Sequence, residues 1–392
     1  MRTRPPLTLI ALFFMAFVFY TNDYMIAGVL PEVARGLGTS VSTAGQLVTF
    51  FSLTIAIVAP VAAVTLARLP RRRVFVMALL LFVSANAVAA TSPSFLALVL
   101  LRIAAAAAAA AATPALHAFA AQIAPSGKRG RYTAIVTLGV TGSLAAGVPL
   151  GTWIGGQLGW RATFLTMAGA GVLALALVLV LVPLGVPTNV PPSLRQQMKA
   201  LTEAPIVLGL AATCALMCGT MMLLTYFASY LDAMTHAGIG ERAAALGLAG
   251  LAGMVGVVGG GIAVDRMGAE RTLYIGVAAF CLTMVALWLL RFVAPIPFPI
   301  ILGLGIVWGA TAFWNAPAIQ IRLYGLSAAL APQALALNTS SNFLGVSLGG
   351  ALGGLIVAGF GVSHIPLLSA AFGAAALVLL SGAQRWGFSA RT

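Results

Sequence analysis

The segment GIAVDRMGAERTL, residues 261–273, places four charged residues between two long apolar stretches. Those stretches, residues 243–264 and 271–292, each have the length of about 20 residues that a helix needs to cross a bilayer. A related segment, AVTLARLPRRRVF, begins at Ala63, and a shift of 198 residues places Arg266 on Arg68 and Arg271 on Arg73. Because this shift is about half the chain, it indicates an internal repeat of membrane helices.

Twelve apolar stretches in all are long enough to span a membrane. They cover residues 7–30, 43–66, 74–92, 95–122, 133–156, 162–183, 205–231, 243–264, 271–292, 297–321, 332–358 and 364–386. Of the 392 residues, 61% are hydrophobic and only 7% are charged, whereas a soluble globular domain has about 25% charged residues. The sequence therefore predicts an all-α membrane protein with twelve transmembrane helices.

The basic residues are unevenly divided between the loops. A net charge of +14 in a soluble chain would suggest nucleic-acid binding. Sixteen of the 21 Lys and Arg residues lie in one set of alternate loops, however, and four lie in the other set, namely Arg35, Arg161, Arg242 and Arg291. The positive-inside rule then places the first set and both termini in the cytoplasm. The excess charge faces anionic membrane lipids, and no nucleic acid partner is expected.

The longest polar connection, GVPTNVPPSLRQQMKALTEAP at residues 185–205, divides the spans six and six. Its four prolines and its basic residues suit a cytoplasmic linker. We therefore expect an N-terminal six-helix bundle at residues 1–184, a linker at 185–204 and a C-terminal six-helix bundle at 205–392.

The pattern G-x-x-x-D-R-x-G-x-x-R, from Gly261 to Arg271, resembles the loop signature of the major facilitator superfamily, which lies between the second and third helices of a half. The resemblance implies that family's fold, two six-helix bundles related by a pseudo-two-fold axis. It also implies a gating loop in which Asp265 pairs with Arg266 or Arg271 and holds helix ends together in one transport state. The alternative is that these are merely charges facing the cytoplasm.

The first copy of this loop departs from the signature. Ala63, Ala67 and Pro70 stand where the second copy has Gly, Asp and Gly. Arg68 and Arg73 are therefore weaker members of the expected gating loop.

Regularly spaced glycines mark three spans. In GVPLGTWIG, Gly147, Gly151 and Gly155 recur every four residues and form a groove for a neighbouring helix, and Pro149 adds a kink. This stretch loosely resembles the glycine and proline signature of the antiporter branch. Further glycines stand at 247, 250, 253, 256 and 259 and at 345, 349 and 353. Close packing alone explains any one stripe, but in the resembled family the fifth and eighth helices meet across the interface between the halves.

Asp23, in FVFYTNDYMIAGVL at residues 17–30, is the single one of seven acidic residues that lies well inside a span. A charged Asp at a helix centre costs on the order of 3 kcal/mol, so we expect it to face a cavity or a partner. Arg102 lies seven residues from the outer end of its span, as Asp23 does. At about 1.5 Å per residue both are about 10 Å below the same boundary. We expect contact between them, direct or through water.

Two further stretches carry a resemblance. LLRIAAAAAAAA from Leu100 looks like the fourth-helix arginine motif of drug:proton antiporters, with alanine in place of its usual Gln and Gly. TNDYMIAGVLPEVARGLG from Thr21 looks like the first-helix acidic segment of the drug, sugar and nucleoside efflux group. The resemblance implies that Asp23 and Arg102 couple proton movement to export.

Other polar and aromatic residues within the spans are candidate substrate contacts. They are Asn22, Tyr24, Asn86, His117, Thr225, Tyr226, Trp314, Asn315, Asn338 and Asn342. The alternative for each is an interhelical hydrogen bond worth about 0.6 kcal/mol, and His117 is also a candidate proton relay. Cys214, Cys218 and Cys281 lie inside spans and are expected to pack as small side chains, with no disulfide and no metal.

The first functional hypothesis is a secondary active transporter of the bacterial cytoplasmic (inner) membrane. It would export a small, neutral or weakly charged drug, sugar or nucleoside in exchange for protons by alternating access. An importer or facilitator on the same fold, working by symport or uniport, is the alternative. An intramembrane enzyme is disfavoured, because the sequence has no H-E-x-x-H and no phosphate-binding loop with Lys. The expected partners of a monomer are substrate, protons and membrane lipids, and no cofactor is expected.

Overall fold

The structure is a computed structural model that describes residues 5–126, 128–184, 194–326 and 330–389. Within these residues the regular structure is helical, and twelve spans are long and apolar enough to cross a membrane. This confirms the expected all-α class and the twelve transmembrane helices. Arg2, Arg4, Arg391 and the first part of the expected linker, residues 185–193, lie outside the described residues, as does the side chain of Arg385.

The first six spans are held by short connections. They are α1 Pro5–Gly36, α2 Val41–Thr65, α3 Arg71–Ala89, α4 Phe95–Ile123, the continuous run of α5 Arg129–Gly142, η1 Ser143–Gly147 and α6 Val148–Leu158, and α7 Trp160–Leu181. Ser40 and Ser94 cap α2 and α4 by accepting hydrogen bonds from the backbone N–H groups of Thr43 and Ala97. Each cap satisfies a donor that the first turn of a helix cannot satisfy itself.

The last six spans follow a short helical connection, α8 Leu194–Met198 and η2 Lys199–Thr202. They are α9 Ala204–Thr235, α10 Ile239–Met267, α11 Ala269–Leu289 with η3 Leu290–Val293, α12 Phe298–Trp314 with α13 Ala316–Leu326, α14 Ala331–Phe360, and η4 Val362–His364 with α15 Ile365–Ser389. Gly268, the second signature glycine of the opening segment, joins α10 to α11 at φ 83. A side chain is strained in that conformation, which accounts for glycine at this position.

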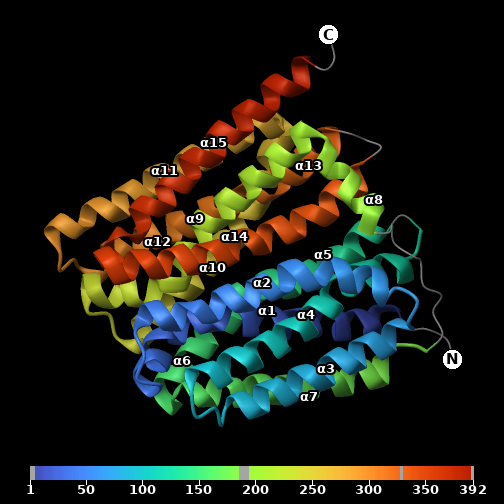
Figure 1. Cartoon of the computed structure of the whole chain (residues 1–392), viewed down its shortest axis with the longest axis horizontal. Helices are drawn as coiled ribbons and strands as arrows, with labels where there is room; N and C mark the ends of the chain where they lie inside the picture. The colour runs from blue at the N-terminus through green and yellow to red at the C-terminus, as the bar shows by residue number, and fades with distance from the viewer. Residues whose placement is uncertain (1–4, 127, 185–193, 327–329, 390–392) are drawn as a thin grey trace.

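Helices α1–α7 form one group and helices α9–α15 form the other, and the two groups lie side by side (Figure 1). The contacts between them include those of α2 with α14, of α1 with α9, and of α10 with the run of η1 and α6. The start of α1 and α8 lie at the right-hand end of the molecule in Figure 1, and the end of α15 lies toward its upper right. We call the right-hand end the linker end and the other the distal end. The division of the chain at residues 184 and 204 stays a prediction.

The glycine stripe of the fifth span lies against α1. Hydrogens in place of side chains at Gly147, Gly151 and Gly155 leave room for Thr21, Met25 and Val29 of α1, three residues spaced by four. The contact with α10 uses another face of the same span, where Gly247 lies against Pro149 and Gly250 against the backbone of Leu144. Small residues thus let the fifth span approach α1 and α10 at once.

The kink expected at Pro149 takes the form of a wide turn. Residues Ser143–Gly147 form a π-helical turn between α5 and α6. Because Pro149 has no N–H, the carbonyl of Ala145 loses its usual helical partner, and a π turn is one way in which a helix absorbs such a gap. The turn lies where the span contacts both α1 and α10.

The glycines of α10 and of α14 each allow close packing against two neighbouring helices. Along α10, Gly247 contacts α6, whereas Gly256 and Gly260 lie against the backbone of α12 in the tenth span. The glycines of α10 therefore contact α6 near one end of the helix and α12 near the other. Along α14, Gly345, Gly349 and Gly353 lie against α9, while Gly350 and Gly354 lie against α2. Adjacent glycine pairs therefore allow α14 to pack closely on two opposite helices.

We predict that Gly250→Val weakens the α10 contact with the fifth span. A Cβ at position 250 would lie 2.5 Å from the carbonyl oxygen of Leu144, which is backbone and cannot rotate away. Overpacking of this kind costs about 1–3 kcal/mol, so the midpoint of thermal denaturation in detergent should fall by several degrees. Gly303→Val is the matched control, because a Cβ there meets nothing within 4 Å. Equal midpoints for the two variants would contradict the role of Gly250.

Candidate functional site

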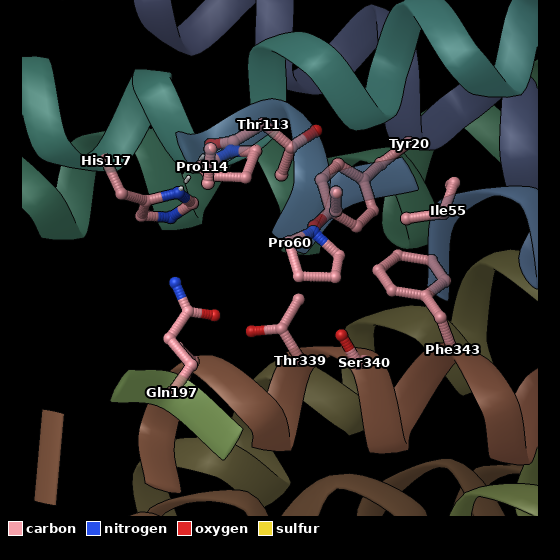
Figure 2. Close-up of a pocket in the computed structure, with 13 residues that line it drawn as sticks. Tyr20, Ile55, Pro60, Thr113, Pro114, His117, Gln197, Thr339, Ser340 and Phe343 are labelled. Atoms are coloured by element: carbon pink, nitrogen blue, oxygen red, sulfur yellow. Dashed lines mark hydrogen bonds between the residues drawn. The ribbon is translucent and has the colours of Figure 1, made fainter. Parts of the chain in front are cut away.

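A cavity of about 300 Å³ lies between the two groups of helices, toward the linker end. Its walls come from α1, α2 and α4 on one side, from α14 on the other, and from α8. The lining residues are Tyr20, Ile55, Ala59, Pro60, Ala63, Thr113, Pro114, His117, Gln197, Ala336, Thr339, Ser340 and Phe343. Figure 2 shows these side chains facing one another across the gap. No Asp, Glu, Lys or Arg is among the described residues that line it.

The distal end is closed by hydrogen bonds between α2 and α14. The Ser42 hydroxyl donates to the carbonyl of Gly354 at 2.7 Å, and the Ser347 hydroxyl donates to the carbonyl of Thr49 at 3.1 Å. The Tyr226 hydroxyl of α9 donates to the carbonyl of Gly350 at 2.9 Å, directly beside Gly45 of α2. Because glycines bring these backbones together, carbonyl groups of α14 are within reach of the hydroxyls.

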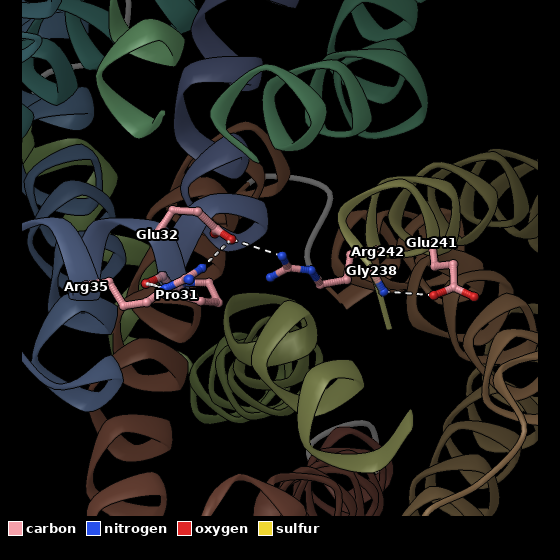
Figure 3. A network of polar contacts seen from close by, with 6 residues as sticks. All are labelled: Pro31, Glu32, Arg35, Gly238, Glu241 and Arg242. Carbon is pink, nitrogen blue, oxygen red and sulfur yellow. Dashed lines mark hydrogen bonds and ion pairs between the residues drawn. The ribbon is translucent and has the colours of Figure 1, made fainter. Parts of the chain in front are cut away.

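An ion pair also joins α1 to α10 at the distal end (Figure 3). Glu32 Oε1 lies 3.0 Å from Arg242 Nη2 and 3.1 Å from Arg35 Nη2. The side chain of Arg242 is only 7% exposed, whereas that of Arg35 is 74% exposed. Glu241 accepts a hydrogen bond from the backbone N–H of Gly238 at 2.8 Å and so fixes the start of α10, next to Arg242. The buried pair of Glu32 and Arg242 therefore holds the two groups of helices together at this end.

Arg102 is buried in the first group of helices and contacts the main chain of α1. Its Nη1 donates to the carbonyl oxygen of Asn22 at 2.6 Å, and its Nη2 lies 3.5 Å from the carbonyl oxygen of Asp23. The guanidinium also lies over the ring of Phe51, 4.0 Å from the centroid, a cation–π contact. The structure thus brings Asp23 and Arg102 together, with the guanidinium bonded to backbone carbonyls and no ion pair to the carboxylate within the described residues.

Three consecutive polar side chains of α1 lie in the interior without a hydrogen-bond partner. They are the Thr21 hydroxyl, the Asn22 amide and both carboxylate oxygens of Asp23, taken within the described part of the chain. Asn22 and Asp23 are 0% and 2% exposed. Buried polar atoms are nearly always paired in stable proteins, and an unpaired carboxylate is the costliest case. This stretch of α1 is therefore the strongest functional candidate outside the cavity.

Of the ten candidate substrate contacts, His117 is the one that lines the cavity. Its Nδ1 lies 3.4 Å from the carbonyl oxygen of Thr113, one turn earlier on α4. Tyr24 lies one turn beyond Tyr20, with ring centroids 6.0 Å apart, and Tyr20 itself lines the cavity. Asn22 lies beside Arg102, as described above.

None of the other candidates lines the cavity, and five of them make hydrogen bonds within or between helices. Asn86 and Thr225 donate to carbonyls of Phe82 and Met221 on their own helices, at 2.9 and 2.7 Å. Tyr226 contributes to the distal closure. Trp314 Nε1 donates to the carbonyl of Thr272 at 3.2 Å, and Asn315 donates to that of Thr311 at 3.4 Å. Asn338 and Asn342 are on α14 beside the lining face, but neither lines the cavity.

Sequence analysis did not single out several lining residues. Ala336, Thr339, Ser340 and Phe343 are spaced as one face of α14, and this spacing was the available signal. The asparagines at 338 and 342 drew attention instead because they are more polar. Gln197 belongs to the connection and carried no signal, since nothing in the sequence places the connection against the cavity.

The expected gating loop is solvated in this structure. The side chains of Asp265, Arg266, Arg271, Arg68 and Arg73 are exposed and make no hydrogen bond or ion pair with any described residue. Its neighbour Glu270 accepts from Arg322 Nε at 2.6 Å, and Arg322 Nη2 donates to the carbonyl of Leu380 at 3.1 Å. In this region the ion pair of Glu270 with Arg322 therefore joins α11 to α13, and the hydrogen bond of Arg322 joins α13 to α15. The role of the loop as a latch stays a prediction.

Comparison with known proteins gives a consistent result. A model described as the Major Facilitator Superfamily matches residues 12–331. The inner membrane transport protein YdhP of Escherichia coli (strain K12) is 30% identical over 374 residues, which are 95% of this chain and 94% of YdhP. A chloramphenicol resistance protein of Streptomyces lividans is 31% identical over 224 residues, 56% of this chain and 57% of that protein. The crystal structure of a D-xylose-proton symporter matches with a TM-score of 0.75 at 17% identity, covering 95% of this chain and 96% of that one.

We predict that breaking the pair of Glu32 and Arg242 loosens the distal end. In a background with the three native cysteines replaced by alanine, Ala245→Cys places a thiol one turn from Arg242, at a position that is 2% exposed. Glu32→Gln should speed labelling of this thiol by a polar maleimide about five-fold, since a partly buried pair contributes about 1 kcal/mol. The reason is that Arg242 would lose its carboxylate partner.

Two further variants make this test specific. The reciprocal variant Glu32→Arg with Arg242→Glu should restore slow labelling, because the charges again match. Arg35→Gln, which removes the exposed partner of Glu32, should leave the rate unchanged. Labelling that is equally slow in Glu32→Gln and in the parent would show that the pair does not hold this end closed.

Proposed function

The chain belongs to the Major Facilitator Superfamily, and from this premise we propose that it exports a small, neutral or weakly charged molecule in exchange for protons. It is a multi-pass inner-membrane transporter and not an enzyme. The proposal adds the direction of transport, the coupling to protons and the substrate class, which is that of drugs, sugars or nucleosides.

The observation that carries the proposal is the buried, unpaired carboxylate of Asp23. Binding or release of one proton changes the charge of the protein interior by one unit at this position. A charge in the middle of a membrane protein is costly, and ionisable residues found there usually lie on ion or proton pathways. No other Asp or Glu among the described residues is buried to this degree. Asp23 is therefore the group that we assign to proton coupling.

Arg102 has a complementary part in this proposal. Its hydrogen bond to the carbonyl of Asn22 does not depend on whether the Asp23 carboxyl carries a proton. The guanidinium therefore keeps its place, and its positive charge compensates Asp23 only when Asp23 is ionised. Protonation of Asp23 leaves one positive charge in the interior, and this difference between the two forms can favour different arrangements of the helices.

The asymmetry of the two ends supports a transport cycle. The distal end is closed by the bonds of α2 with α14 and by the pair of Glu32 with Arg242, whereas the cavity lies toward the linker end. The positive-inside distribution of Lys and Arg assigns the linker end to the cytoplasm. In this assignment the structure is inward-facing and collects substrate from the cytoplasm. Rocking of the two groups of helices about the cavity would then present the substrate outside.

Relatives support the direction of transport. A probable sugar efflux transporter of Mannheimia succiniciproducens bears a name that describes export, and the Streptomyces lividans relative is named for resistance to chloramphenicol. The likeness to the D-xylose-proton symporter keeps proton-coupled import as the alternative. Addition of substrate to energised inverted vesicles separates the two, because only exchange drives protons out of the lumen and makes it more alkaline.

We predict that Asp23→Asn abolishes gradient-driven export while the protein still folds and reaches the membrane. The amide keeps the size of the side chain but binds no proton in the physiological range, so a proton gradient can no longer do work. A panel of toxic compounds, tested for growth with and without expression, first supplies a substrate. Uptake of that substrate into inverted vesicles with an imposed pH gradient is then measured.

Asp232→Asn is the matched control for this experiment. It makes the same chemical change at an exposed position near the end of α9, so export should continue at the wild-type rate. If Asp23→Asn accumulated substrate against its gradient as well as the wild type does, Asp23 would not be the coupling group.

A further inference from the structure

The connection between the two groups of helices forms part of the cavity wall. Gln197 of α8 is only 5% exposed, although its neighbour Met198 is 54% exposed. The short helix packs against both α14 and α2, one helix from each group, and these two helices also line the cavity. Figure 2 shows the Gln197 side chain rising from the connection toward His117, with Thr339 beside it.

The lining is divided by chemistry. At one end, His117, Gln197, Thr339 and Ser340 present an imidazole, an amide and two hydroxyls (Figure 2). At the other end, the rings of Tyr20 and Phe343 lie with centroids 6.4 Å apart, next to Ile55, and Pro60 lies between the two ends. The described residues supply no carboxylate, ammonium or guanidinium to either end. A ligand that fits this lining has an apolar ring, several hydrogen-bonding groups and no net charge.

Gln197 is suited to contact such a ligand. A primary amide has two N–H donors and a carbonyl with two lone pairs, so it is able to bond to a ligand in addition to a partner in the protein. A buried amide that loses a hydrogen-bond partner is penalised, which makes the site discriminate against molecules that lack the matching group. Hydroxyls from α14 and the ring of His117 from α4 lie across the same space.

We propose that Gln197 is a ligand-contacting, specificity-determining residue that the connection supplies to the cavity. The ligand is an uncharged molecule whose ring lies against Tyr20 and Phe343 and whose hydroxyl or amide groups meet Gln197, Thr339, Ser340 and His117. This rests on the proposed function in one respect, that the exported molecule occupies this cavity. The connection is then a wall of the binding site as well as a tether between the two groups of helices.

The test is equilibrium binding to the full chain in lipid nanodiscs, with no proton gradient present. Three uncharged probes carry a ring with hydroxyl or amide groups: chloramphenicol, uridine and phenyl β-D-glucoside. The quaternary cation tetraphenylphosphonium is the charged, purely apolar comparison. At least one uncharged probe should bind more tightly than the cation does. If none of the three binds, the assigned ligand class is overturned.

Gln197→Ala should raise the Kd of the bound probe about ten-fold, which corresponds to about 1.4 kcal/mol and to one hydrogen bond. Met198→Ala is the matched control, since it changes an exposed neighbour on the same short helix, and its Kd should equal that of wild type. Gln197→Glu keeps the shape but replaces the two N–H donors, so it should also weaken binding. The midpoint of thermal denaturation without probe should be the same in Gln197→Ala and Met198→Ala, which separates a lost contact from a lost fold.

The outcomes also separate this inference from the proposed function. If the Kd of Gln197→Ala equals that of Met198→Ala while wild-type vesicles export in exchange for protons, the role of Gln197 is wrong and the proposed function stands. If probe binding depends on Gln197 but no proton exchange accompanies transport, the inference stands and the proposed coupling fails.

Discussion

The close approach of helix backbones at glycine is the constraint on which the rest of this structure depends. Between apolar helices in lipid there is little hydrophobic driving force, so association relies on van der Waals packing and on hydrogen bonds. Glycines of α14 bring its carbonyls within reach of Ser42 and Tyr226, and Gly250 of α10 lies on the backbone of Leu144. The glycine stripes therefore fasten the distal end, whereas the cavity lies toward the linker end.

Buried or partly buried charged residues lie at three levels between the distal end and the linker end. The pair of Glu32 and Arg242 lies at the distal end, and the pair of Glu270 and Arg322 lies toward the linker end. Between them, Asp23 has no hydrogen-bond partner in the described chain and Arg102 is bonded to the main chain. The two paired sites have a structural explanation, because each joins helices. Asp23 has none, and for that reason the proposed proton coupling is assigned to it.

The sequence was sufficient for the fold and for part of the candidate site. Apolar length and loop charge are local properties, so the twelve spans and the contrast between Asp23 and the loop acids could be predicted from them. The pairing of Glu32 with Arg242 spans 210 residues and depends on how α1 meets α10, which no local pattern encodes. On α14 the residues that line the cavity, Thr339 and Phe343, each follow one of the predicted candidates, Asn338 and Asn342. Polarity favoured the asparagines, whereas packing against α2 and α9 decides which side chains face the cavity. The contribution of Gln197 depends on where the connection folds, and composition alone does not determine that.

The cavity and the proposed coupling group are connected through a single helix. Tyr20 lines the cavity, Asp23 follows three residues later on α1, and the ring of Tyr20 lies against those of Tyr24 and Phe343. A ligand whose ring lies against Tyr20 and Phe343 therefore touches α1 within one turn of Asp23, so its binding and the protonation of Asp23 share the same backbone. By thermodynamic linkage, if protonation of Asp23 changes the ligand affinity by some factor, binding of the ligand changes the proton affinity of Asp23 by the same factor. Exchange of substrate for protons needs this factor to be well below one, so that protonation of Asp23 weakens ligand binding. The turn of α1 that carries both Tyr20 and Asp23, held to Arg102 through the carbonyl of Asn22, is a short and continuous route by which protonation and ligand binding can oppose each other.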